Sequence, residues 1–315
     1  MIKLTDKNTK ILICCHKPSV LPESPFFLPI HVGKAISDFD LGITGDDTGD
    51  NISSKNKNYC ELTALYWAWK NIKKEYPDLE YIGLFHYRRF FDFARKDKCF
   101  DYVLNNEKEV INYSLESEKI RKLLLHNKFI LCNKKIYPYT LQIDYCMCHV
   151  SDDFRLLKKI VHKIYPEYDR SFYYIFEVNN KIFPCNMFIT SYEEFEKYCT
   201  WLFPLLFEIE KQCNIKGYSE SQARIYGYMA ERLFNLYIYH NSLKAAFLPI
   251  LWYKDNENKK RSKKKYIIQN LRNSFSAHIL YLSSAPSFRT YISNMLHTFH
   301  LEKILVLIKW INNNR

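Results

Sequence analysis

The chain has 315 residues, and 17% of them are aromatic while only 7 are glycine, a composition that excludes an intrinsically disordered protein. Its formal net charge at pH 7 is +12, but residues 251–315 contain 12 Lys and Arg against 3 Asp and Glu, a net charge of +9. Residues 1–250 therefore carry only the remaining +3. This asymmetry predicts a nearly neutral folded domain over residues 1–250 and a basic extension over residues 251–315.

The ten cysteines form no pair of CxxC motifs and no regular framework. We therefore expect neither a zinc site nor a disulfide scaffold, and we predict a reduced, cytoplasmic setting. No stretch of about 18 consecutive apolar residues occurs, so the sequence predicts no membrane span.

Two apolar runs end in cationic residues. Residues 10–15 (KILICC) predict a buried strand that stops at His16, Lys17 and Pro18, and residues 81–85 predict a second strand that stops at His86-Tyr87-Arg88-Arg89. Ligands of open α/β sheets bind beyond the carboxyl ends of the strands, and guanidinium groups bind phosphate oxygens. The cluster after residue 85 is thus interpreted either as an anion site or as solvated surface charge.

Residues 59–76 predict a helix, because Leu62, Leu65, Tyr66, Trp69 and Ile72 follow a helical spacing. The helix lies between the two predicted strands, which gives the strand–helix–strand order of an α/β protein. Glu61 falls in its first turn, where the helix dipole favours an acid, and a structural role suffices for it.

Residues 45–53 (GDDTGDNIS) form a polar segment that contains Asp46, Asp47, Asp50 and Asn51. One interpretation is an ordinary turn, since Asp and Asn bond to their own backbone. The other is a site for hydroxyls or a metal ion, because three carboxylates in five residues repel one another without a partner.

Further strands are predicted at residues 128–132 and 183–190, and the segment 97–127 is expected to be helical in part. Asn186 interrupts the second of these runs and must be either a structural clasp or a ligand contact. Helices are predicted to begin at capping residues Ser151, Ser191 and Ser219.

The last of these helices, to about residue 240, carries a polar stripe in which Arg224, Tyr228, Glu231 and Asn235 are spaced 4, 3 and 4 residues apart. The stripe either faces solvent as an intrahelical charge network or lines a cavity. Because the helix is apolar around most of its girth, we favour the cavity.

Residues 254–265 form a polybasic run, and residues 300–311 are apolar on one side. This combination is typical of an interfacial helix on an anionic membrane, and nucleic-acid binding is the competing interpretation.

Seven motifs together resemble a bacterial family first catalogued as a domain of unknown function and grouped with the GT-A nucleotide-sugar glycosyltransferases. They are CHK at 15–17, PIHVG at 29–33, GDDTGDNIS at 45–53, YCELTALYWAWKN at 59–71, FHYRRFF at 85–91, CNMFI at 185–189 and RIYGYMAERLF at 224–234. The resemblance covers roughly residues 10–250. Assigned members of that family include galactofuranosyltransferases of O-antigen and capsule synthesis.

The resemblance implies a mixed, mainly parallel sheet with helices on both faces and a UDP-sugar site at the strand ends. Most GT-A enzymes place an Asp-x-Asp that holds a divalent metal where this chain has His86-Tyr87-Arg88. We therefore expect Arg88 and Arg89, with Lys17, to stabilise the UDP leaving group. On this expectation the enzyme requires no cofactor, and none of its residues is a metal ligand. A Mn²⁺ or Mg²⁺ ion at the carboxylates of residues 46–50 stays open as an alternative.

Transfer of galactofuranose to a β-linkage inverts the anomeric carbon and needs one general base. Glu231 is the leading candidate because it lies on the polar stripe of a helix expected to be largely buried, and His86 is a second catalytic candidate. The expected substrate-binding residues are His16, Lys17, Asp46, Asp47, Asn51, Asn56, Arg88, Arg89, Asn186, Arg224 and Tyr228.

The sequence thus predicts an inverting glycosyltransferase that moves galactofuranose onto a lipid-linked oligosaccharide of a surface polysaccharide. The basic extension would hold it on the inner face of the cell membrane, and no nucleic acid partner is expected. The alternatives are a non-catalytic membrane-surface module and a nucleic-acid-binding protein. Against the second alternative, the chain contains no recognised nucleic-acid-binding motif.

Overall fold

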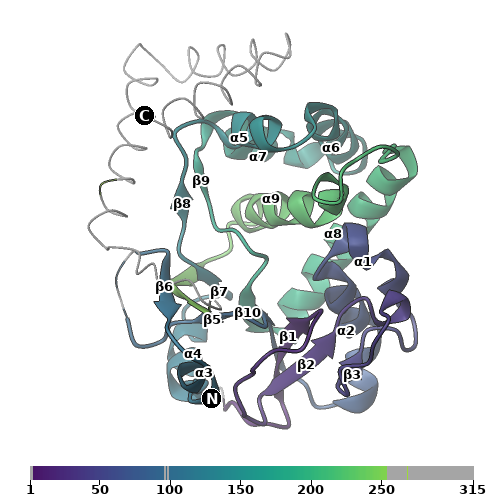
Figure 1. Cartoon of the computed structure of the whole chain (residues 1–315). Coiled ribbons are helices and arrows are strands. Elements are labelled where there is room, and N and C mark those ends of the chain that lie inside the picture. The colour runs from purple at the N-terminus through teal and green to yellow at the C-terminus, as the bar shows by residue number, and fades with distance from the viewer. Residues whose placement is uncertain (1–2, 96, 98, 254–267, 269–315) are drawn as a thin grey trace.

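The computed structural model describes residues 3–95, 97, 99–253 and 268 (Figure 1). Its strands are β1 (Thr9–Cys15), β2 (Phe27–His31), β3 (Thr44–Gly45), β4 (Tyr81–His86), β5 (Arg89–Phe91), β6 (Asp101–Leu104), β7 (Phe129–Cys132), β8 (Lys135–Ile136), β9 (Lys181–Ile182), β10 (Phe188–Ser191), β11 (Ala245–Leu248) and β12 (Ile250–Tyr253). Its α-helices are α1 (Asn56–Tyr59), α2 (Leu62–Glu75), α3 (Glu107–Ile111), α4 (Ser117–Leu124), α5 (Leu141–Cys148), α6 (Ser151–Ile164), α7 (Asp169–Phe172), α8 (Tyr192–Gln212) and α9 (Ile225–His240).

A mixed, mainly parallel sheet organises the described residues. Its order is β11-β7-β10-β4-β1-β2-β3, and β5, β12 and β6 continue from the end of β4. The neighbours β1, β2 and β4 are parallel, whereas β10 is antiparallel to both β4 and β7. As a result, the turn before β10 lies at the same edge of the sheet as the carboxyl end of β4.

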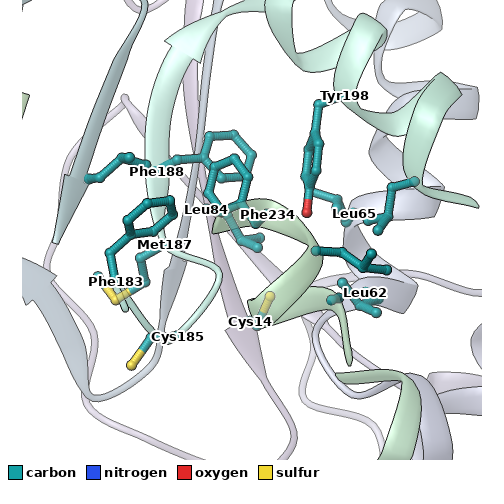
Figure 2. Packing of buried hydrophobic residues seen from close by; sticks show 14 of the residues in the cluster. Cys14, Leu62, Leu65, Leu84, Phe183, Cys185, Met187, Phe188, Tyr198 and Phe234 are labelled. Atoms are coloured by element: carbon teal, nitrogen blue, oxygen red, sulfur yellow. The ribbon is translucent and has the colours of Figure 1, made fainter. Parts of the chain in front are cut away.

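Alternate residues of β4 pack on opposite faces of the sheet, because side chains in a strand point alternately to its two sides. Leu84 meets Phe188 of β10, Phe234 of α9, and residues of α2 and α8 in one buried cluster (Figure 2). Phe85 points the other way and contacts the aromatic rings of Phe27 and Phe91. Helices therefore cover both faces, as the sequence predicted, and Figure 1 shows α9 between the sheet and α5 to α7.

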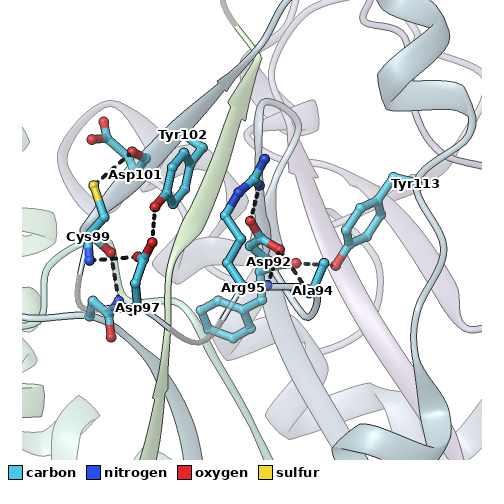
Figure 3. Close-up of polar contacts among 10 residues, drawn as sticks. Asp92, Ala94, Arg95, Asp97, Cys99, Asp101, Tyr102 and Tyr113 are labelled. Atoms are coloured by element: carbon cyan, nitrogen blue, oxygen red, sulfur yellow. Dashed lines mark hydrogen bonds and ion pairs between the residues drawn. The ribbon is translucent and has the colours of Figure 1, made fainter. Parts of the chain in front are cut away.

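The connection after β5 is held by its own polar groups (Figure 3). The carboxylate of buried Asp92 accepts hydrogen bonds from the backbone N–H groups of Ala94 and Arg95 and pairs with the Arg95 guanidinium. Asn133, which follows β7, donates to the carbonyl oxygens of Asp97 and Cys99 at 3.0 and 2.6 Å. These bonds fix the chain that leads away from Arg89.

Several predicted element boundaries are wrong. The helix predicted over residues 59–76 is split between α1 and α2, because Cys60 has a φ of 54° and ends α1. Ser151 is the first residue of α6 rather than its cap, and α9 begins at Ile225 after a 3₁₀ turn at Gln222–Arg224. Ser191 is confirmed as a cap, since its hydroxyl accepts a hydrogen bond from the Glu194 N–H.

Strand β12 runs to Tyr253 and pairs with β5 and β6, so the sheet crosses the predicted domain boundary at residue 250. The rest of the predicted extension, apart from residue 268, lies outside the described residues. Within the part of the chain that the structure describes, no helix combines the length and apolar character needed to cross a bilayer.

Candidate active site

The carboxyl ends of β1 and β4 meet three other segments at one edge of the sheet. His16 and Lys17 follow β1, and His86 ends β4. The turn before β10, the junction between α1 and α2, and the first turns of α9 lie against this edge, as their contacts below show. Chain folding thus brings together residues that are up to about 200 positions apart, which is the arrangement that α/β folds use for ligand sites.

The turn at Cys185 and Asn186 is the hub of these contacts. Both residues have positive φ, 79° and 49°, which is uncommon for residues other than glycine. His86 Nε2 lies 2.7 Å from the Cys185 carbonyl oxygen, and the Cys185 N–H donates to Glu231 Oε1 at 2.9 Å. Strand β4 and helix α9 therefore hold the backbone carbonyl and the backbone N–H of the same residue, Cys185. Since a carbonyl accepts, Nε2 of His86 carries the proton.

Asn186 joins this turn to the start of α2. Its side-chain Nδ2 donates to Glu61 Oε1 at 2.8 Å, while its own Oδ1 is buried and has no hydrogen-bond partner among the described residues. Burial raises the pKa of the Glu61 carboxyl, and the Asn186 amide, Arg224 and Arg89 act in the opposite direction. Glu61 thus lies among the candidate site residues, and the sequence did not predict this because its contact with Asn186 spans 125 positions.

Cationic side chains surround the same strand ends. The Arg88 guanidinium lies 4.8 Å from the Tyr87 ring centroid and the Lys17 ammonium 5.8 Å from it, while Arg89 lies 4.6 Å from the Trp252 ring. The pKa of His16 is lowered by burial and then by Lys17, Arg88 and Arg224. Positive charge from three separate segments therefore converges near the end of β1.

Arg224 reaches this edge from the turn that precedes α9. Its Nε donates to Cys60 Sγ at 3.2 Å, and its guanidinium lies 5.8 Å from the ring of Tyr228. Among the described residues, no carboxylate forms an ion pair with Arg88, Arg89 or Arg224. Elsewhere, arginines do pair with acids, namely Arg95, Arg121, Arg155 and Arg232.

His86 is neutral near pH 7. Burial lowers its pKa from 6.5 to about 4, and the nearby Arg89 adds to the effect. An uncharged imidazole at this position leaves the arginines as the cations of the site.

Comparison with known proteins bears on the same residues. Residues 10–242 match the family described as Domain of unknown function (DUF4422). The chain belongs to this family. Its fold is similar to the apo structure of the WbbM bifunctional glycosyltransferase, with a TM-score of 0.69 and 31% identity over 79% of this chain. The match covers 46% of that chain, so this protein spans less than half the length of WbbM. A comparison with curated proteins finds no match.

These findings confirm the relationship to glycosyltransferases that the motifs indicated. All seven motifs fall within the matched residues 10–242, and the structure places five of them around the edge just described. The DUF4422 domain thus has a glycosyltransferase-like fold with a cluster of arginines and carboxyl groups at its strand ends.

The loop after β3 lies at the same edge but two strands away from β1, and its polar groups are engaged within the chain. Asp46 is fully buried and accepts from the N–H groups of Gly33 and Lys34 and from the Ser53 hydroxyl. Asn51 bonds to the backbone of its own loop, and Asn56 bonds to Cys60 O and Thr63. Such contacts are expected if residues 45–53 form an ordinary turn. Asp47 is exposed.

The polar stripe of α9 runs from exposed to buried. Arg224 is exposed, Tyr228 and Glu231 are half-buried, and Asn235 is buried. Asn235 exchanges two hydrogen bonds with the backbone of Phe183, at 3.1 and 3.0 Å, and so anchors the segment that leads to the turn at Cys185. The predicted stripe therefore ends in a structural clasp, and its first three residues belong to the strand-end cluster.

The position that carries Asp-x-Asp in most GT-A enzymes has a histidine, a tyrosine and an arginine in this DUF4422 domain, and these side chains do not fit a divalent ion on a diphosphate. Within residues 3–95, 97 and 99–253, no group of three or more His, Cys, Asp and Glu side chains is placed to hold a metal ion.

Proposed function

We propose that this DUF4422 domain is a glycosyltransferase that uses a nucleotide-diphosphate sugar, with UDP-galactofuranose as the donor. The observation that supports this most strongly is the set of three arginines, Arg88, Arg89 and Arg224, that gather at the strand ends without acidic partners among the described residues. Such a set suits an anionic ligand, because guanidinium groups bind phosphate oxygens in a bidentate manner. The fold's similarity to a glycosyltransferase makes a nucleotide diphosphate the expected ligand.

Departure of UDP builds negative charge on the β-phosphate, and preorganised cations stabilise that charge in the transition state. In this proposal Arg88 and Arg89 supply the cations directly, and Arg224 and Lys17 complete the set. His86 stays neutral and donates from Nε2 to the Cys185 carbonyl, so it holds the turn in place beside the leaving group.

Glu231 is the proposed general base of an inverting transfer. Its Oε1 accepts from the Cys185 N–H, which fixes the orientation of the carboxylate, and its Oε2 has no hydrogen-bond partner among the described residues. A half-buried carboxylate held in this way can take the proton from the acceptor hydroxyl as that oxygen attacks the anomeric carbon. The reaction breaks the bond between the anomeric carbon and UDP and yields the β-linked sugar.

The proposed acceptor is a lipid-linked oligosaccharide of a surface polysaccharide. The basic composition of residues 251–315 suits a peripheral position on an anionic membrane surface. The second activity that the name of WbbM implies is not extended to this chain, since less than half of that protein is matched.

A thermal-shift panel tests the nucleotide preference. UDP, GDP, CMP and dTDP and their sugar conjugates would each be added with EDTA or with Mn²⁺, because a ligand of the native state raises its melting temperature. We expect UDP and UDP-galactofuranose each to raise the melting temperature as much in EDTA as in Mn²⁺. Stabilisation only with Mn²⁺ would refute the arginine-based site, and no response to any nucleotide would favour a non-catalytic membrane module.

A further inference from the structure

We infer that Glu61 and Asn186 bind the hydroxyl groups of the sugar that is transferred. This inference rests on the proposed function and adds the subsite that distinguishes a UDP-sugar from UDP alone.

The buried amide oxygen of Asn186 is the first observation behind it. The residue is 3% exposed, and its Oδ1 accepts no hydrogen bond from any described residue. A buried acceptor without a donor raises the free energy of the folded state, because it has lost its hydrogen bonds to water. A ligand hydroxyl would supply the missing donor.

The backbone turn that places Asn186 is held by its surroundings. Asn186 and Cys185 both have positive φ; asparagine tolerates this conformation, whereas for a cysteine the surroundings must impose it. Here Glu231, His86 and Glu61 each bond to the turn. Three side chains thus keep Oδ1 oriented, and such strained residues cluster at ligand sites.

Glu61 supplies the second acceptor. Its Oε1 accepts from Asn186 Nδ2, and the other hydrogen bond to the carboxylate among the described residues comes from the backbone N–H of Glu61 itself. A carboxylate has about four acceptor positions, so acceptor capacity remains for a ligand. A carboxylate oxygen beside an amide oxygen accepts from two neighbouring hydroxyls, which is the pattern that a sugar diol presents. Arg89 and Arg224 both favour the ionised form of Glu61.

The arginines also indicate which sugar is bound. Arg89 and Arg224 act electrostatically on Glu61 and belong to the proposed diphosphate site. In a nucleotide sugar the transferred residue is attached directly to the diphosphate. Hydroxyl acceptors next to the diphosphate arginines therefore contact the donor sugar rather than a distant part of the acceptor.

The test compares the dissociation constants of UDP and UDP-galactofuranose by calorimetry for the full-length wild type, Glu61→Gln and Asn186→Gly. Glutamine keeps the size of Glu61 and its acceptor for Asn186, and glycine tolerates positive φ without strain. The wild type should bind the UDP-sugar more tightly than UDP. The ratio of the UDP dissociation constant to the UDP-galactofuranose dissociation constant measures this preference. Each variant should lower the ratio by about tenfold, the effect of one lost charge-assisted or buried hydrogen bond, while the affinity for UDP stays within about twofold.

Glu194→Gln is the matched control. Glu194 is also a buried carboxylate in the first turn of a helix, but it lies where β10 ends beside the start of β4, at the opposite edge of the sheet. The Glu194→Gln variant should show the same ratio of UDP to UDP-galactofuranose dissociation constants as the wild type. An unchanged ratio in both site variants would overturn the inference, as would equal weakening of UDP and UDP-sugar. Absence of UDP binding by the wild type would instead refute the proposed function.

Discussion

Glu231 is the residue on which the proposed chemistry depends most directly. Replacement by Gln removes the base while it keeps an oxygen that can accept from the Cys185 N–H. We expect kcat to fall by about 10²–10⁴-fold, the usual contribution of a general base, with the dissociation constant of UDP unchanged. Steady-state kinetics and calorimetry check both values. Equal loss of UDP binding and turnover would show that Glu231 only supports the turn.

Arg89 differs from Arg88 in its surroundings. Its charge shifts the pKa values of Glu61, His86 and Cys185, all of which belong to or contact the turn before β10. Arg89→Gln should weaken UDP binding by about tenfold or more, because a charge-assisted bond to phosphate contributes about 1.5–3 kcal/mol. Arg121→Gln is the control, since Arg121 pairs with Glu118 on α4 away from the strand ends. Equal UDP affinities in the two variants would contradict the arginine-based site.

Buried histidines make stability depend on pH, and the effect is largest for His86 and His149. Burial lowers the pKa of both His86 and His149 from 6.5 to about 4, so between these values the unfolded chain binds protons that the native chain does not. The free energy of unfolding should therefore fall as pH falls from about 6.5 to 4.

Urea denaturation of the wild type and His149→Gln at several pH values checks this dependence. The variant lacks one of the two groups, so its stability should fall less steeply over the same range. A slope identical to that of the wild type would show that His149 is accessible to protons in the native state.

At the scale of single elements, the central strand β4 depends on Gly83. A Cβ atom there would lie 2.7 Å from Ile11 Cδ1 and 2.9 Å from the Phe188 carbonyl oxygen, both closer than van der Waals contact allows. Gly83→Ala should therefore destabilise the protein by about 1–3 kcal/mol, the usual effect of overpacking. Denaturant titration measures the change.

Ile11→Val supplies the matched background for this variant, since it removes the Cδ1 atom that meets the new methyl group. In that background Gly83→Ala should cost less than in the wild type, because only the contacts with Phe188 and Ile189 remain. Equal costs in both backgrounds would show that Ile11 is not the limiting contact.

The sequence predicts the elements whose residues alternate or repeat. The apolar runs of β1 and β4 and the stripe of α2 are recognisable because burial demands them, and the cations that follow the strands mark the edge of the sheet. The backbone conformations of Cys60, Cys185 and Asn186 could not be predicted, since positive φ in residues other than glycine leaves no compositional signal. Asp46 was a candidate ligand because its carboxylate stands in a polar loop, but the donors that engage it come partly from residues 33 and 34.

At the scale of the whole molecule, charge divides the chain into a nearly neutral domain and a basic segment after residue 250. If the basic segment binds anionic lipid, each lysine near the surface contributes about 1 kcal/mol. Replacement of Lys263, Lys264 and Lys265 by Glu in the full chain should sharply weaken sedimentation with phosphatidylserine vesicles and leave UDP affinity unchanged. Unaltered vesicle binding would contradict the membrane role of this segment.

Sugar transfer itself is the most direct test of the proposed function. The full-length protein would be incubated with UDP-galactofuranose and a lipid-linked galactoside in EDTA, and the product analysed by NMR. The proposed site predicts release of UDP and formation of a β-galactofuranoside, both lost in Glu231→Gln. Formation of product only after Mn²⁺ or Mg²⁺ is restored, or of an α-linked product, would contradict the arginine-based inverting mechanism.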